Sequence, residues 1–122
     1  MNTILIVEDE ADYREILKER LEKEGYRVFA APDGQKGLDV IAENDIDLVL
    51  LDYIMPEMDG KEFLETLQTK FKKHIPIMLL TNLDRSIDLP DIRETIMKAN
   101  VSLDDLIRKV KTHLPLTEKS SG

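Results

Sequence analysis

Four short apolar runs, each followed directly by a polar or charged residue, constrain the fold of this chain more than any other feature. The runs end at Glu8-Asp9, Asp52, Thr81 and Lys98. Segments with the apolar period of a helix separate them, and this alternation predicts buried parallel strands joined by helices. In such a sheet the carboxyl ends of the strands open on one edge, where ligands bind. We therefore expect these polar residues, far apart in the sequence, to lie in one crevice.

The chain is predicted to be one α/β domain in which strands and helices alternate. Apolar residues spaced three and four apart mark the helices, and Tyr13, Ile16 and Leu17 are expected on the buried face of the first. Strands are expected at 3–7, 27–31, 48–51 and 75–81, and helices at 11–24, between Gly34 and Asn44, from Gly60 to Phe71, and between Ser102 and Pro115.

Small polar residues mark the ends of these helices. Asp33, Asp59 and Ser102 are predicted to cap the helices that follow them, because their side chains can accept a hydrogen bond from a first-turn N–H. Gly25 is predicted to end the first helix.

The stretch from Asn82 to Thr95 is polar and interrupted. It leaves room only for a short helix starting near Pro90, and we expect the region to be irregular. Pro115 is predicted to stop the last helix. Residues 1–115 are therefore predicted to form the domain, and residues 116–122 a polar, disordered tail.

Composition excludes several classes of function. With 17 Lys and Arg against 25 Asp and Glu, the 122 residues carry a net charge of -8, which disfavours direct binding to nucleic acid. The absence of cysteine excludes thiol catalysis and disulfides, and it fits a reducing compartment, for which the cytoplasm is the default. No apolar stretch approaches the roughly 18 residues of a membrane span, so no membrane partner is expected.

The strand-end residues have the chemistry of phosphoryl transfer. The carboxylates of Glu8, Asp9 and Asp52 would repel one another at a common edge, and a hard divalent cation, Mg²⁺, is the expected compensation, with Asp9 and Asp52 as direct ligands. The cation would shield Asp52 from an approaching phosphate dianion, so that Asp52 can act as a nucleophile and become an aspartyl phosphate. The Lys98 ammonium and the Thr81 hydroxyl can bond the phosphoryl oxygens.

Each of these residues, taken alone, also has a purely structural interpretation. Asp9 lies directly before a helix, where it could be an N-cap. Thr81 could bond backbone at a strand end, and Lys98 could be a solvated lysine. The occurrence of all of them at strand ends is what favours the catalytic interpretation.

From about Asn2 to Leu114 the chain resembles the receiver domain of two-component response regulators. The resemblance rests on Glu8-Asp9, on the segment LLDYIMPEMDG from Leu50 to Gly60, on Thr81 and on Lys98. It implies a flavodoxin-like, doubly wound sheet of five parallel strands in the order 2-1-3-4-5. It also implies five flanking helices, of which the fourth is short or irregular here.

The resemblance further implies how the site works. Asp52 would be phosphorylated by a histidine kinase or a histidine phosphotransfer protein in a phosphorelay, and Lys98 and Thr81 would assist. Mg²⁺ would be held by Asp9, Asp52 and the backbone carbonyl of Ile54, with Glu8 acting through water. The output would be contact with a downstream protein, without turnover of a separate substrate.

Three departures from the family pattern concern the signalling face. Thr95 stands three positions before the lysine, where the family usually has an aromatic residue. Ala99 follows the lysine, where the family commonly has a proline in a cis peptide, and we predict a trans bond because a cis bond before a non-proline residue costs about 2.5–4 kcal/mol. The stretch from Thr81 to Lys98 is also shorter than usual, at the place of the fourth helix.

Ile54 and Leu83 are expected to flank the site with apolar side chains, where other receivers often carry polar ones that position water. This predicts slow self-dephosphorylation.

Other functions are left open. The three departures favour a receiver-like interaction module that no longer switches. An aspartate-nucleophile phosphatase of the haloacid dehalogenase type is a second alternative, although such enzymes typically carry an aspartate where this chain has Ile54. A receiver cut from a longer kinase or transcription factor is a third.

Overall fold

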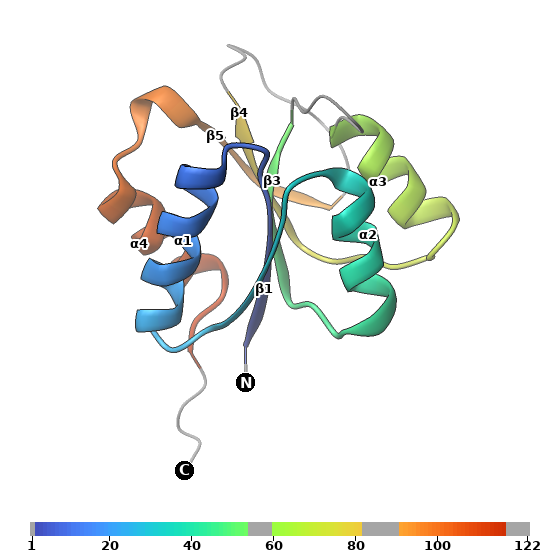
Figure 1. The fold of residues 1–122 in the computed structure, drawn as a ribbon, viewed down its shortest axis with the longest axis horizontal. Helices are drawn as coiled ribbons and strands as arrows, with labels where there is room; N and C mark the ends of the chain where they lie inside the picture. Colours follow the sequence, from blue (N-terminus) through green and yellow to red (C-terminus); the bar gives the residue numbers. More distant parts are fainter. Residues whose placement is uncertain (1, 54–59, 82–90, 117–122) are drawn as a thin grey trace.

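The computed structural model describes residues 2–53, 60–81 and 91–116, which form a sheet covered by helices on both faces (Figure 1). Five parallel strands lie in the order β2-β1-β3-β4-β5, so the strand order implied by the resemblance is confirmed. The strands are β1 (Thr3–Val7), β2 (Arg27–Ala31), β3 (Leu48–Asp52), β4 (Ile77–Thr81) and β5 (Ile92–Met97).

Two helices pack on each face of the sheet. Figure 1 shows α1 and α4 on one face and α2 and α3 on the other. A single turn of 3-10 helix, η1 (Lys98–Asn100), directly follows β5. The α-helices are α1 (Ala11–Lys23), α2 (Gly34–Glu43), α3 (Gly60–Thr69) and α4 (Leu103–His113).

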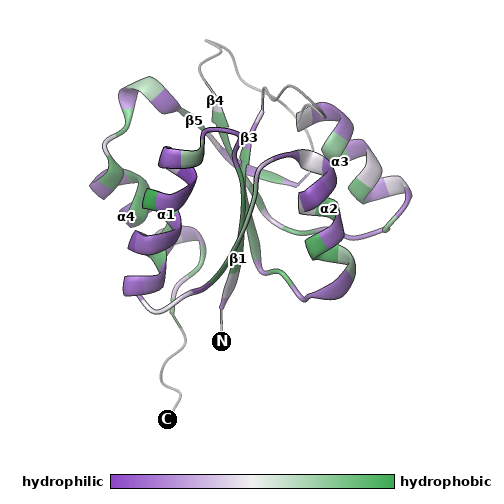
Figure 2. Cartoon of the chain, in the orientation of Figure 1, coloured by the Kyte–Doolittle hydropathy of each residue, from purple (hydrophilic) through white to green (hydrophobic). Residues whose placement is uncertain are grey.

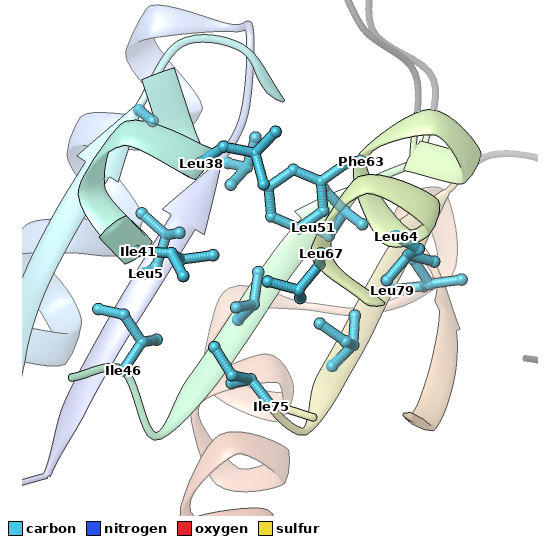
Figure 3. Close-up of a cluster of buried hydrophobic side chains, with 14 residues drawn as sticks. Leu5, Leu38, Ile41, Ile46, Leu51, Phe63, Leu64, Leu67, Ile75 and Leu79 are labelled. Atoms are coloured by element: carbon cyan, nitrogen blue, oxygen red, sulfur yellow. The ribbon is translucent and has the colours of Figure 1, made fainter. Parts of the chain in front are cut away.

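Side chains along each central strand alternate between two hydrophobic clusters. In β1, Leu5 belongs to the cluster under α2 and α3, whereas Ile4 belongs to the cluster under α1 and α4. In Figure 3 the Phe63 ring of α3 points toward Leu38 of α2. Figure 2 shows hydrophobic central strands and largely hydrophilic outer helix surfaces. Both faces of the strands are buried, which is why they occur in the sequence as continuous apolar runs.

The expected helix between β4 and β5 is not found in the part of the chain that the structure describes. That part contains four α-helices, where the resemblance implied five. Residues 82–90, including Pro90, lie outside the described residues, but Ile92–Met97 is strand, so a helix continuing from Pro90 into this segment is wrong. Pairing with β4 satisfies the backbone of this polar segment, and only its Ile96 is fully buried.

The helix caps explain several boundaries. Asp33 Oδ1 accepts a hydrogen bond from the Lys36 N–H at 2.8 Å, and Ser102 Oγ accepts one from the Asp105 N–H at 3.1 Å, so both predicted N-caps are confirmed. Gly25 has a φ of 108°, a left-handed conformation that ends α1 and that glycine adopts without strain. Asp59, the third predicted cap, lies outside the described residues.

The buried face of α1 differs from the prediction at one position. Leu17 and Leu21 are fully buried and Tyr13 is half-buried, whereas Ile16 is 45% exposed. Positions 13, 17 and 21 are four residues apart and form one stripe, but position 16 is rotated by about 100° from Leu17. The prediction that Ile16 faces the core is therefore wrong.

The end of α4 is tied to the edge of the sheet where the strands begin. Tyr26 Oη donates a hydrogen bond of 2.6 Å to the Leu114 carbonyl, and Asn2 Nδ2 donates one of 2.6 Å to the Pro115 carbonyl. Residues 117–122 of the predicted tail lie outside the described residues, so the boundary at 115 stays a prediction.

Candidate functional site

The structure brings the predicted strand-end residues to one edge of the sheet. Glu8 directly follows β1, Asp52 and Thr81 are the last residues of β3 and β4, and Lys98 directly follows β5. Because these strands are parallel, their carboxyl ends share the upper edge of the sheet in Figure 1. Glu8, Asp52 and Thr81 are all buried.

Three carboxylates form a cluster at this edge. One oxygen each from Glu8, Asp9 and Asp52 lies within 4.8 Å of the others. Glu8 and Asp52 are buried, whereas Asp9 is exposed, so the cluster has a solvent-facing side. Charges of one sign this close repel, and oxygen ligands in such a group fit a hard cation such as Mg²⁺.

Glu8 is held by several hydrogen bonds. Its Oε2 accepts a hydrogen bond of 3.0 Å from the Glu10 N–H, and its Oε1 accepts one of 2.8 Å from Lys98 Nζ. Its backbone carbonyl accepts a 2.8 Å hydrogen bond from Arg14 Nη1, and its own N–H donates to the Ala31 carbonyl. Because both side-chain oxygens are already bonded to protein donors, Glu8 is suited to shaping the site around Asp9 and Asp52.

The structural alternative for Asp9 does not hold. The N-cap residue of α1 is Glu10, and its side chain makes no capping hydrogen bond. Asp9 instead contributes its carboxylate to the acidic cluster.

Lys98 supplies positive charge to this cluster. Its ammonium lies 2.8 Å from Glu8 Oε1, 3.0 Å from Glu10 Oε1 and 3.8 Å from Asp52 Oδ2. Burial opposes its charge, but these carboxylates outweigh burial and raise the Lys98 pKa above its ordinary value. The side chain is only 12% exposed, so the solvated-lysine interpretation does not hold. The described residues contain no cis peptide, and the predicted trans bond before Ala99 is confirmed.

Family comparison agrees with this geometry. The chain matches the family model described as the response regulator receiver domain over residues 4–112. The chain belongs to this family. Membership in this family fits both the fold and the acidic cluster at the strand ends.

Solved receiver structures are similar over nearly the whole chain. The response regulator TrrA of Thermotoga maritima, solved in complex with Mg(2+)-BeF, is 39% identical and has a TM-score of 0.78, with 93% of this chain and 100% of that chain covered. A structure of the histidine kinase ThkA in complex with TrrA matches with 35% identity and a TM-score of 0.76, covering 93% and 99%. The receiver domain of the hybrid histidine kinase CckA is 30% identical, with a TM-score of 0.78 and coverage of 93% and 99%.

Two residues of this receiver domain contact Lys98 without having been predicted as site residues. Glu10 accepts a hydrogen bond from Lys98 Nζ, and the Tyr13 ring centroid lies 4.6 Å from the same atom. The run of three acidic residues from Glu8 to Glu10 was a usable signal for the first. The spacing of apolar residues predicts Tyr13 on the buried face of its helix, and only the tertiary structure places its ring beside Lys98.

Thr95, the first departure on the signalling face, lies within β5 and is half-buried. It lines a groove of about 540 Å³ between β5 and α4, together with Met97, Arg108 and Thr112. A small side chain at position 95 leaves this groove open.

Some site predictions fall outside the described residues. Ile54, the predicted carbonyl ligand, and Leu83, its predicted apolar neighbour, are among them, so their roles stay predictions. Within residues 2–53, 60–81 and 91–116, the helices are too short and polar for any of them to cross a membrane.

Proposed function

We propose that this receiver domain is a phosphorylation-activated switch in a two-component phosphorelay and accepts a phosphoryl group on Asp52. The observation that carries the proposal is the approach of three carboxylates to within 4.8 Å of one another, with the Lys98 ammonium 3.8 Å from Asp52. An acidic pocket with one buried ammonium can hold a cation and a phosphoryl group side by side.

Mg²⁺ is the proposed cofactor. Asp9, Asp52 and the carbonyl of Ile54 would hold it, and Glu8 would act through water, since both Glu8 side-chain oxygens already accept hydrogen bonds from the chain. The bound ion would supply the positive charge that lets a phosphate dianion approach a carboxylate. The TrrA complex with Mg(2+)-BeF supports this choice, because TrrA is 39% identical to this chain.

The proposed attack needs no base to remove a proton, because a carboxylate oxygen is itself the nucleophile. A carboxylate oxygen of Asp52 forms a bond to phosphorus while the bond from phosphorus to the donor breaks, and the leaving group keeps that electron pair. Lys98 would turn one N–H from Glu10 toward a phosphoryl oxygen, a small change for an ammonium already 3.8 Å from Asp52. Thr81, buried at the end of β4, would donate its hydroxyl to another phosphoryl oxygen.

A histidine kinase or a histidine phosphotransfer protein is the proposed donor. The structure of ThkA bound to TrrA supports a kinase partner, given the 35% identity of its receiver to this chain. The proposed output is contact with another protein, since a net charge of -8 disfavours direct binding to nucleic acid. In this role the domain is a switch and has no substrate of its own to turn over.

A specific observation favours a second candidate, a receiver-like module that binds a partner without switching. The groove beside Thr95 is open between β5 and α4, so no large side chain at position 95 is available to move when the site is filled. Such a module would keep the acidic cluster but would show the same partner affinity with and without a phosphoryl group.

The test is incubation with Mg²⁺ and acetyl phosphate, followed by intact mass spectrometry. One phosphoryl adduct is expected, lost in Asp52→Asn and on chelation of Mg²⁺, and retained in Asp39→Asn, which changes an exposed carboxylate on α2. No adduct with either acetyl phosphate or a phosphorylated histidine donor would contradict the proposal. Steady hydrolysis of a generic phosphoester would instead support the phosphatase alternative.

A further inference from the structure

The ring of Tyr13 covers the ammonium of Lys98. We propose that Tyr13 is a positioning residue for phosphoryl transfer, which holds this ammonium beside Asp52 through its aromatic face. The inference rests on the proposed function of Asp52. It adds a residue from outside the strand ends to the machinery of the site.

The geometry fits a cation–π contact. Lys98 Nζ lies 4.6 Å from the centroid of the Tyr13 ring, within the distance of about 6 Å at which a ring attracts an ammonium. The Lys98 side chain is 12% exposed, so the contact is partly withdrawn from water, where such an attraction is stronger.

Lys98 needs such support because of where its backbone lies. It begins η1, a turn of only three residues that follows β5 at the edge of the sheet. A lysine side chain has a four-carbon stem with many rotamers. Its hydrogen bond to the buried Glu8 fixes one N–H, but its hydrogen bond to Glu10 gives limited restraint, because the Glu10 side chain is 67% exposed and water competes for it.

A neutral ring can hold the ammonium without opposing the reaction. Glu8 and Glu10 attract Lys98, but their negative charges also repel an incoming phosphate dianion. The ring attracts Lys98 by its quadrupole and carries no net charge, so it adds no further negative charge to repel the phosphate. Tyr13 is therefore suited to keep Lys98 in place when the ammonium leaves Glu10 for the phosphoryl group.

Tyr13 is itself well fixed relative to the acidic cluster. It lies in the first turn of α1 and packs against the core cluster beneath that helix. The next residue, Arg14, donates from its backbone N–H to the Glu10 carbonyl at 2.9 Å and from Nη1 to the Glu8 carbonyl at 2.8 Å. Arg14 thus links the start of α1 to Glu8, which helps to hold the Tyr13 ring over Lys98.

The experiment compares rates of adduct formation from acetyl phosphate and Mg²⁺. Tyr13→Leu is expected to lower the rate about five- to thirtyfold, the range of a cation–π contact, whereas Tyr13→Phe keeps the ring and is expected to restore most of the rate. Mg²⁺ affinity, measured by calorimetry, is expected to stay unchanged in Tyr13→Leu, because Glu8, Asp9 and Asp52 are intact.

A second comparison, made in a protein that carries Lys98→Met, distinguishes positioning of the Lys98 ammonium from a general structural effect of Tyr13. In Lys98→Met, which removes the ammonium, adding Tyr13→Leu is expected to change the rate less than about twofold, because coupled residues are non-additive. Tyr26→Leu is the matched control, since it removes another tyrosine ring of the same core cluster at the opposite edge of the sheet. It is expected to lower the unfolding temperature and leave the rate unchanged.

The outcomes are distinguishable. An equal loss of rate from Tyr13→Leu with and without Lys98, or a loss in Tyr13→Phe as large as in Tyr13→Leu, would overturn the inference alone. A wild-type protein that accepts no phosphoryl group from any donor would overturn the proposed function and the inference together.

Discussion

The Lys98 ammonium donates a 2.8 Å hydrogen bond to Oε1 of Glu8, a carboxylate whose side chain is only 1% exposed. A buried carboxylate of this kind needs a partner, because an unpaired buried charge is strongly destabilising. The lysine proposed to stabilise a phosphoryl group therefore also stabilises the fold before any phosphoryl group arrives. Function and stability are coupled at this pair, and unfolding measurements can report on the site.

Lys98→Met is expected to lower the free energy of unfolding by about 2–4 kcal/mol at neutral pH without Mg²⁺, because it removes the ammonium that is ion-paired with the buried Glu8 carboxylate. Saturating Mg²⁺ should restore part of the loss by supplying positive charge to the same carboxylates. Urea unfolding with and without Mg²⁺ measures both effects, with Lys36→Met, at an exposed position, as the control. An equal loss in Lys36→Met would contradict this explanation.

Asp52→Asn is expected to raise the free energy of unfolding, whereas Lys98→Met is expected to lower it. Without Mg²⁺ it should stabilise the protein by about 1 kcal/mol, because it removes one of three carboxylates that lie within 4.8 Å of one another, and each such like-charged pair repels by about 1–4 kcal/mol. Adding Mg²⁺ should stabilise the variant less than it stabilises the wild type, since one proposed ligand of the ion is missing. Thermal unfolding scans at several Mg²⁺ concentrations test this, and a destabilised metal-free variant would argue against net repulsion.

Glu94 gives a prediction for acid pH. Burial opposes its charge, but hydrogen bonds from Lys109 and from His113 outweigh burial and lower the Glu94 pKa. A carboxylate with a lowered folded-state pKa contributes stability above its unfolded value, and this contribution is lost as pH falls through the folded value. The wild type should therefore be more stable than Glu94→Gln at neutral pH, and the difference should disappear between about pH 5 and pH 3.

Urea unfolding of both proteins across this pH range makes the measurement. Glu19→Gln, an exposed charge change on α1, is the control and should show a much smaller difference at neutral pH. If the difference in free energy of unfolding between wild type and Glu94→Gln instead stays constant down to about pH 3, the interaction between β5 and α4 does not depend on the Glu94 charge.

Gly60 is expected to be intolerant of a side chain. Its N–H donates a 2.7 Å hydrogen bond to the Tyr53 carbonyl, and a Cβ at this position would clash with the Tyr53 ring and backbone. Gly60→Ala should destabilise the protein by about 1–3 kcal/mol and weaken Mg²⁺ binding, because Tyr53 directly follows Asp52. Thermal unfolding and calorimetry measure the two effects, and Lys61→Ala, an exposed neighbour, should show neither.

The aspartyl phosphate is expected to be long-lived, because the sequence has apolar Ile54 and Leu83 where polar side chains that position water would speed hydrolysis. Decay of the purified phosphorylated protein, followed by intact mass spectrometry, measures the lifetime. A half-life of only seconds would contradict the prediction.

Much of the fold could be predicted from the sequence because the central strands are buried on both faces. β1, β3 and the caps at Asp33 and Ser102 follow directly from apolar runs and local hydrogen bonding. β5 was harder to predict from the sequence, because an edge strand with exposed Arg93 and half-buried Glu94 has no continuous apolar run. The strand conformation of β5 is stabilised by pairing with β4. This is a tertiary interaction, and it leaves little pattern in the local sequence.

The site was predictable to the extent that it depends on strand ends. Parallel strands bring Glu8 and Asp52 to one edge whatever the details of packing, and Lys98 joins them for the same reason. The ring of Tyr13 reaches Lys98 only through the placement of α1 against the sheet. A residue on one helix and a residue after the last strand share no pattern in the sequence, so this contact required the structure.

The hydrogen bond from Asn2 to the Pro115 carbonyl brings these two residues together at the edge of the sheet opposite the acidic cluster. A short linker could therefore close the backbone there, and new termini could be opened elsewhere in a circular permutant. A fluorescent label or an affinity tag attached next to Asn2 or Pro115 would stand a full strand length away from Asp52. The proposed phosphoryl acceptor could then be studied on a surface-immobilised protein with the acidic cluster facing the solution.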